Sequence, residues 1–155
     1  MCVQVIAAAC PDRPTPGERL VLDGLRCWAS SRMDGGAPEI AVQRIVAWRA
    51  SERVGAFFVA WMRAVEEGRR RPIEIHCVHC HGASIDEQRL VAALGVAAID
   101  PDLGEALLEP LLVDPGVVIT LARALNGALA ASGLPVPARL RTEPIPPPRS
   151  EATVH

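Results

Sequence analysis

The sequence predicts a mainly α-helical fold, a single-domain bundle of about five to six helices. Half of the 155 residues are hydrophobic, which is enough apolar surface for an ordinary core in a chain of this length. The apolar set is dominated by Ala, Leu and Val, with few aromatic residues and no Tyr. Because Ala and Leu are good helix formers and small side chains let helices approach closely, this composition favours a helical bundle over a sandwich.

Composition divides the chain into three segments. Residues 1–17 join a short apolar stretch, whose residues 3–6 suit one strand or a docked arm, to a Pro/Gly-rich stretch, and we expect an N-terminal arm there. Residues 18–134 carry the helical patterns and form the predicted domain. Residues 135–155 are rich in proline and poor in apolar anchors, which predicts a disordered or extended tail.

The first two helices follow from apolar spacing and from end signals. We expect the first over residues 18–33, ended by Asp34-Gly35-Gly36, and the second over residues 38–48, with Pro38 in its first turn. Apolar residues recur near the 3.6-residue period in both, with Leu22, Leu25 and Ala29 in the first and Ile40, Ala41, Ile45 and Trp48 in the second.

The third helix has the clearest pattern. We expect it over residues 51–70, from the N-cap Ser51 to the run Arg69-Arg70-Arg71, because positive charge suits the C-terminal end of a helix dipole. Pro72 then breaks the helix. The apolar stripe is spaced at helical intervals along its length: Val54, Phe57, Phe58, Trp61, Met62 and Val65.

Three further helices are predicted after residue 80. Ser84 and Glu87 form a capping box that opens a fourth helix, which runs to about residue 98. Asp102 is expected to cap a short fifth helix. Asp114-Pro115 opens a sixth, which Gly133 ends as the residue after the C-cap.

The chemically distinctive segment is a Cys/His-rich turn between helices three and four, His76-Cys77-Val78-His79-Cys80-His81. It follows Ile73-Glu74-Ile75, which alternates like a short strand. Cys77 and Cys80 form a C-x-x-C that resembles a zinc knuckle, in which two thiolates on a turn bind one side of the metal. A structural Zn²⁺ normally has four ligands, so we expect the others among nearby and more distant side chains: His76, His79, His81, Cys27, Cys10 and Cys2.

Other interpretations of the same cysteines stay open, because the chain has no second C-x-x-C or H-x-x-H pair. Residues 77–81 spell C-x-x-C-H, the c-type haem attachment string, with His81 as the proximal ligand, although haem attachment requires export and no convincing signal peptide is visible. A dithiol redox pair is the second alternative, since a C-x-x-C at a helix N-terminus has a lowered thiol pKa. Inert, half-buried thiols are the third.

The remaining patterns argue against several other classes of function. No P-loop, G-x-G-x-x-G, G-x-S-x-G or H-E-x-x-H occurs, so no catalytic residue is assigned, and Asp86 and Glu87 are interpreted as ordinary acids of a first helical turn. A net charge of −2 makes nucleic-acid binding unfavourable. The sequence contains no run of about 18 apolar residues, the length that would suggest a membrane span. We expect a cytoplasmic protein.

The order of these features resembles a small family of uncharacterised bacterial helical proteins with a central Cys cluster. The likeness spans residues 18–134, from Arg19-Leu20-Val21-Leu22 through the aromatic third helix to Arg69-Arg70-Arg71-Pro72, Cys77 and Cys80, and Asp86-Glu87. Where such relatives have consecutive Cys, this chain has interleaved His. The resemblance implies a helical fold and no particular activity. From the C-x-x-C and its neighbouring histidines we expect structural Zn²⁺ in a regulatory or adaptor module, which would meet a protein partner through a helix face or the Pro-rich tail.

Overall fold

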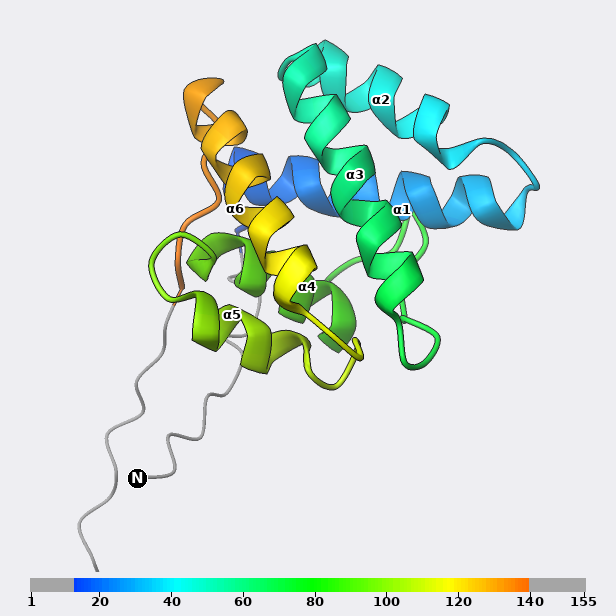
Figure 1. Ribbon diagram of the computed structural model, residues 1–155. Coiled ribbons are helices and arrows are strands. Elements are labelled where there is room, and N and C mark those ends of the chain that lie inside the picture. The colour runs from blue at the N-terminus through cyan, green and yellow to red at the C-terminus, as the bar shows by residue number, and fades with distance from the viewer. Residues whose placement is uncertain (1–12, 140–155) are drawn as a thin grey trace, which may run out of the picture.

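The computed structural model describes residues 13–139, and the mainly α-helical prediction is confirmed there (Figure 1). This range contains six helices and no strand. They are α1 (Pro16–Met33), α2 (Pro38–Arg49), α3 (Glu52–Gly68), α4 (Ile85–Val96), α5 (Pro101–Leu108) and α6 (Gly116–Ala131). The expected strand at residues 3–6 and the candidate ligands Cys2 and Cys10 lie outside the described residues. No helix in the described range is long and apolar enough to cross a membrane.

Local end signals explain where most helices begin and stop. Ser51 accepts a hydrogen bond from the Val54 amide, and Ser84 and Glu87 form the expected capping box. Gly133 follows α6 with a φ of +75°, a left-handed conformation that favours glycine. The predicted cap of α5 is wrong: Asp100 accepts from the Leu103 amide and is the N-cap, because Pro101 occupies the first helical position.

The core lies where α3 packs against its neighbours. α3 contacts α2 on one side and α6 on the other, α1 packs against α2, and α4 packs against α5 (Figure 1). The largest fully buried side chains are aromatic: Trp28, Trp61 and Phe58. The rings of Trp61 and Phe58 meet edge to face, with centroids 5.6 Å apart. A Cβ atom at Gly24 of α1 would lie 2.6 Å from the Phe58 ring, so glycine at this position lets the two helices approach.

The segment between α3 and α4 differs from its prediction. α3 ends at Gly68, earlier than expected, and the Arg69 backbone forms an isolated antiparallel bridge with Leu112. Ile73 and Ile75 are half-buried against the core and Glu74 is exposed, so the alternation is present. Residues 73–75 are nevertheless not a strand, because no other extended segment in the described range lies beside them to pair with.

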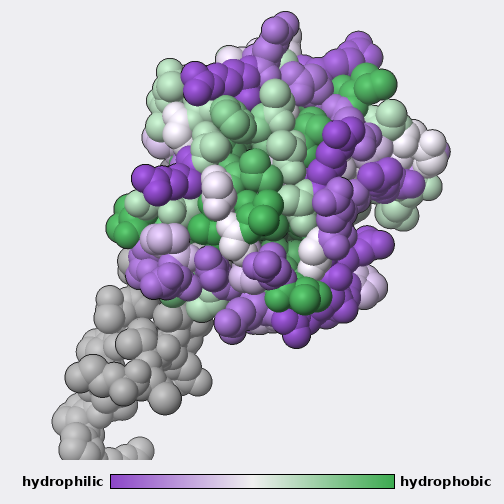
Figure 2. All heavy atoms as spheres, in the orientation of Figure 1, coloured by the Kyte–Doolittle hydropathy of each residue, from purple (hydrophilic) through white to green (hydrophobic). Residues whose placement is uncertain are grey.

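The packed chain extends past both predicted domain boundaries. Pro16 and Gly17 already belong to α1, whose N-cap Thr15 forms a capping box with Glu18. At the other end Val136 is only 3% exposed, so residues 135–139 pack on the helices although the predicted tail starts at residue 135. On the face shown in Figure 2, apolar residues gather over α3 and α6 and hydrophilic residues surround them.

Candidate functional site

The cysteine pair lies at the tip of the loop between α3 and α4. Cys77 and Cys80 are joined by a disulfide, and the Cys80 amide donates a hydrogen bond of 3.1 Å to the Cys77 carbonyl, which closes a tight turn. Cys77, Val78 and His79 are exposed, whereas Cys80 is half-buried. A molecule approaching from solvent therefore reaches the Cys77 side of the disulfide first.

Arg26 of α1 reaches under this loop and holds its C-terminal arm. Its Nη1 donates to the Cys80 carbonyl at 3.0 Å, and its Nη2 donates to the Gly82 carbonyl at 2.6 Å. Gly82 has a φ of +74°, which turns the chain towards α4. A guanidinium offers several donors in one plane, so a single side chain can fix two carbonyl groups of the turn.

Glu87 balances the charge of Arg26. Its carboxylate is fully buried and accepts hydrogen bonds from four N–H groups: Arg26 Nε at 2.9 Å, Arg26 Nη2 at 3.2 Å, the Ser84 amide at 2.8 Å and the His76 amide at 3.3 Å. Burying a carboxylate is unfavourable unless it is paired and hydrogen-bonded, and both conditions are met here. Glu87 thus connects the start of α4, both arms of the loop and α1.

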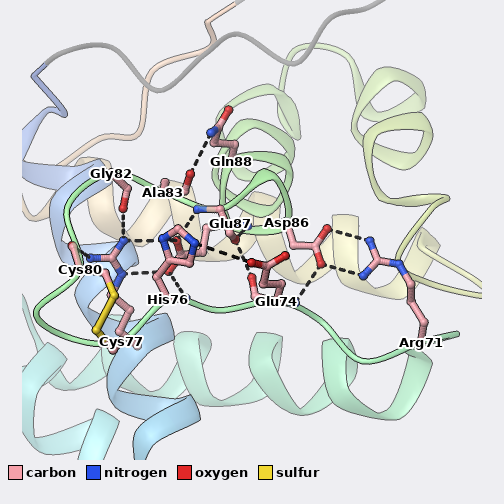
Figure 3. A network of polar contacts seen from close by, with 12 residues as sticks. Arg71, Glu74, His76, Cys77, Cys80, Gly82, Ala83, Asp86, Glu87 and Gln88 are labelled. Atoms are coloured by element: carbon pink, nitrogen blue, oxygen red, sulfur yellow. Dashed lines mark hydrogen bonds and ion pairs between the residues drawn. A yellow bond between two sulfur atoms is a disulfide. The ribbon is translucent and has the colours of Figure 1, made fainter.

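Asp86 holds the start of the loop in the same way. Both carboxylate oxygens accept from Arg71, at 2.8 Å each, and one also accepts from the Glu74 amide at 2.9 Å (Figure 3). Burial alone would raise the pKa of Asp86, but the hydrogen bonds from Arg71 and Glu74 outweigh it, and the pKa is lowered. Ser84 Oγ completes the frame by donating to the Glu74 carbonyl at 2.5 Å.

Six of the candidate metal ligands lie in the described range, and they are not gathered into one site: Cys77, Cys80, Cys27, His76, His79 and His81. The imidazole of His76 faces two carboxylates, with Nε2 3.8 Å from Glu74 and Nδ1 3.9 Å from Glu87, while His79 and His81 are exposed. Among residues 13–139, no group of three or more His, Cys, Asp or Glu side chains is arranged to hold a metal ion. The structure pairs Cys77 with Cys80 and leaves the histidines apart from a shared centre.

Cys27 is the one free cysteine of the described residues, and it lies on α1 beside Arg26. Its thiol is half-buried, and burial raises its pKa. Cys27 lines an open groove of about 500 Å³ that is also lined by Val78, the residue after Cys77. The third thiol is therefore next to the disulfide loop, but its raised pKa makes it a poor nucleophile.

Arg26 is the functional residue that sequence reasoning missed. Its signal was present: it lies four residues after Leu22, between Leu25 and Trp28, on the apolar side of the first helix. A charged residue at a core position needs a buried partner. Glu87 was recognised only as half of a capping box, and its second role could not be seen because its partner is 61 residues away.

Comparison with protein-family models, with curated proteins and with solved structures found no match. The resemblance to bacterial helical proteins with a Cys cluster stays a prediction.

Proposed function

We propose that Cys77 and Cys80 form a reversible dithiol–disulfide pair that exchanges electrons with the dithiol of a partner protein. The observation that carries this proposal is the disulfide at an exposed loop tip whose arms are held by other contacts. Dithiol redox chemistry was one of the alternatives that the sequence left open, and the paired sulfurs support it more than they support a four-ligand zinc centre.

The exchange follows from which sulfur is accessible. A partner thiolate attacks the sulfur of Cys77, the more exposed of the two residues, and forms a mixed disulfide while Cys80 leaves as a thiolate. The second partner thiolate then attacks the partner's own sulfur in this mixed disulfide and releases Cys77. Two electrons and two protons pass from the partner to this protein, which ends with two thiols, and the partner ends with a disulfide.

The frame around the loop allows this cycle without unfolding the domain. Arg26 holds the carbonyls of Cys80 and Gly82, and Glu87 holds the His76 amide, so none of these contacts depends on the disulfide. The disulfide links residues only three positions apart, and a small ring restricts the unfolded chain little. Reduction is therefore expected to change the loop tip and leave the helices intact.

A redox titration tests the proposal. The triple variant Cys2→Ser/Cys10→Ser/Cys27→Ser keeps only the pair. It would be equilibrated with defined ratios of reduced and oxidised dithiothreitol, and of reduced and oxidised glutathione for higher potentials, then alkylated and weighed by mass spectrometry. We expect one two-electron transition, with a slope of about 30 mV per tenfold change in ratio, and the same far-UV circular dichroism at both ends. A pair that stays reduced at every ratio, or a loss of helix on reduction, would contradict the proposal.

Two single variants in that background test the order of attack. Cys80→Ser leaves the exposed thiol of Cys77, and Cys77→Ser leaves the half-buried thiol of Cys80. The Cys77 thiol is expected to react faster with an aromatic disulfide reagent, because reaction requires access as well as a thiolate. Equal rates, or a faster reaction at Cys80, would show that the assigned order is wrong.

Structural Zn²⁺ on the reduced pair, with the protein serving as a regulatory or adaptor module, is the second candidate. Three imidazoles within the same six residues favour it. Titration of the reduced protein with Zn²⁺, in competition with a chelating dye, separates the zinc proposal from the redox proposal. Stoichiometric Zn²⁺ binding would favour a zinc site if one of three variants weakens it: His76→Ala, His79→Ala or His81→Ala. A Soret band would point to haem instead, and thiols that neither oxidise nor bind metal would be inert.

A further inference from the structure

A second pocket lies on the other side of α1 from Cys27 and is independent of the disulfide. It has a volume of about 540 Å³ and opens between α1, α3 and the segment that leads to the cysteine loop. Its floor includes the buried side chains of Trp28 and Met62, and Ile73 and Ile75 form one wall. Its volume falls within the roughly 300–1,000 Å³ of typical small-ligand pockets, and its lining is mostly apolar.

The charged residues of this pocket stand at its rim. Glu66 Oε1 accepts from Trp28 Nε1 at 2.8 Å and from Arg32 Nε at 3.0 Å, and Glu66 Oε2 accepts from Arg32 Nη2 at 2.8 Å. Both oxygens are therefore occupied, and the hydrogen bonds from Arg32, more than any other contact, lower the pKa of Glu66. Arg32 also lies over the Trp28 ring, 5.7 Å from its centroid, and its Nη2 is 3.9 Å from Glu39. Its charge is therefore balanced, and it covers the Trp28 part of the floor.

Arg69 is the remaining cation at the rim. It is exposed, and within residues 13–139 its guanidinium makes no hydrogen bond or salt bridge. Its charge is close enough to contribute to the lowered pKa of Glu66. The pocket thus combines an apolar floor with one positive charge at its mouth. The N–H groups of the Arg69 guanidinium remain available to a ligand. A guanidinium in this position suits a carboxylate, which it can bind through two parallel hydrogen bonds.

We propose that this pocket binds a small amphipathic carboxylate, with the apolar part against Met33, Ile73 and Ile75 and the carboxylate on Arg69. The occupant is a small molecule, because a pocket of about 540 Å³ matches the size of one. The inference uses none of the residues that carry the redox proposal, so either can fail without the other.

Ligands that differ only in their head group test the pocket. Wild-type protein would be titrated calorimetrically with decanoate, decanol and decyltrimethylammonium, each below its micellar concentration. Decanoate is expected to bind saturably and more tightly than decanol, and the cationic ligand least tightly. Absence of saturable decanoate binding, or equal binding of all three ligands, would overturn the proposal.

Matched variants locate the site. Arg69→Gln is expected to weaken decanoate binding by about tenfold, the effect of losing one charge-assisted contact, and to leave decanol binding unchanged. Arg53→Gln is the control, because Arg53 is an exposed arginine of α3 that lies over Phe57 and outside the pocket. Ala29→Phe, which fills the pocket from α1, should abolish binding of both ligands. Equal losses in Arg69→Gln and Arg53→Gln, or unchanged binding in Ala29→Phe, would contradict the assignment. Circular dichroism confirms the fold of each variant.

Discussion

Glu87 shows how one side chain can do several structural tasks at once. It caps its own helix through the Ser84 amide, pairs with Arg26 across 61 residues and fixes the His76 amide. A buried carboxylate is stable only while all its donors remain, since an unpaired charge in the interior is strongly disfavoured. The disulfide loop is therefore positioned by a buried ion pair rather than by the disulfide itself.

Replacing Glu87 by Gln should lower the free energy of unfolding. The amide has nearly the same size, but it removes the negative charge and points an NH₂ group at donors, which leaves Arg26 buried without its counter-charge. We expect a loss of about 3–5 kcal/mol in the free energy of unfolding, measured with urea and far-UV circular dichroism. Glu67→Gln, at an exposed position of α3, is the control and should stay within about 0.5 kcal/mol of wild type. Similar values for the two variants would mean that the ion pair contributes little.

At the scale of single elements, the approach of α1 to α3 depends on one missing side chain. Gly24 faces the Phe58 ring, and Phe58 in turn packs edge to face on Trp61. Because the ring is fully buried among other core residues, it has no open side into which it can move. The distance between these two helices is thus set by a glycine that a helix-propensity scale would count as unfavourable.

Two glycine-to-alanine variants separate packing from propensity. Gly24→Ala should destabilise the protein by about 1–3 kcal/mol, because its methyl group would meet the Phe58 ring at 2.6 Å. Gly127→Ala, in α6, has no neighbour within 4 Å and should raise stability by up to about 1 kcal/mol through helix propensity. Thermal unfolding of both variants tests whether their stabilities change in opposite directions. A stabilised Gly24→Ala would show that α1 and α3 can move apart at little cost.

The elements themselves could be predicted because their signals are local. The capping box at Ser84 and Glu87, the cap at Ser51 and the stop at Gly133 each act within a few residues, and all three are confirmed. The strand at residues 73–75 was wrong because strand formation requires a partner, which no local pattern can supply. The cap of α5 is Asp100 and not the predicted Asp102, because Pro101 is the first helical residue.

The candidate site could be predicted only in part, since its anchors come from different regions of the chain. The C-x-x-C turn was found from spacing, and the two cysteines do lie together. Arg26 was not found, because its contacts with Cys80 and Glu87 span more than fifty residues and depend on how α1 crosses the loop. Whether the histidines join the cysteines also depends on tertiary packing, which directs His76 towards Glu74 and Glu87.

On the scale of the whole molecule, the two ends of the described chain are tied to the helices. Arg139 binds Glu18 of α1 through Nε at 2.6 Å and Nη2 at 3.0 Å, although the two residues are 121 positions apart. Burial alone would raise the pKa of Glu18, but the hydrogen bonds and charge of Arg139, together with Thr15, lower it. Asn126 of α6 holds the intervening segment, accepting from the Val136 amide at 2.9 Å and donating to the Val136 carbonyl at 3.0 Å.

Asn126→Ala tests whether this last segment is an integral part of the fold. Alanine is the better helix former, so any loss of stability must come from the bonds to Val136 and from the third bond, which Asn126 Nδ2 donates to the Leu94 carbonyl at 3.3 Å. We expect a loss of about 1–3 kcal/mol, the cost of part-buried polar groups without partners, and faster hydrogen exchange at the Val136 amide. Thr120→Ala, which removes an exposed hydroxyl of the same helix, should change stability by less than about 0.5 kcal/mol. If Val136 exchanges at the wild-type rate in Asn126→Ala, burial of its own side chain, and not these hydrogen bonds, fixes the segment to α6.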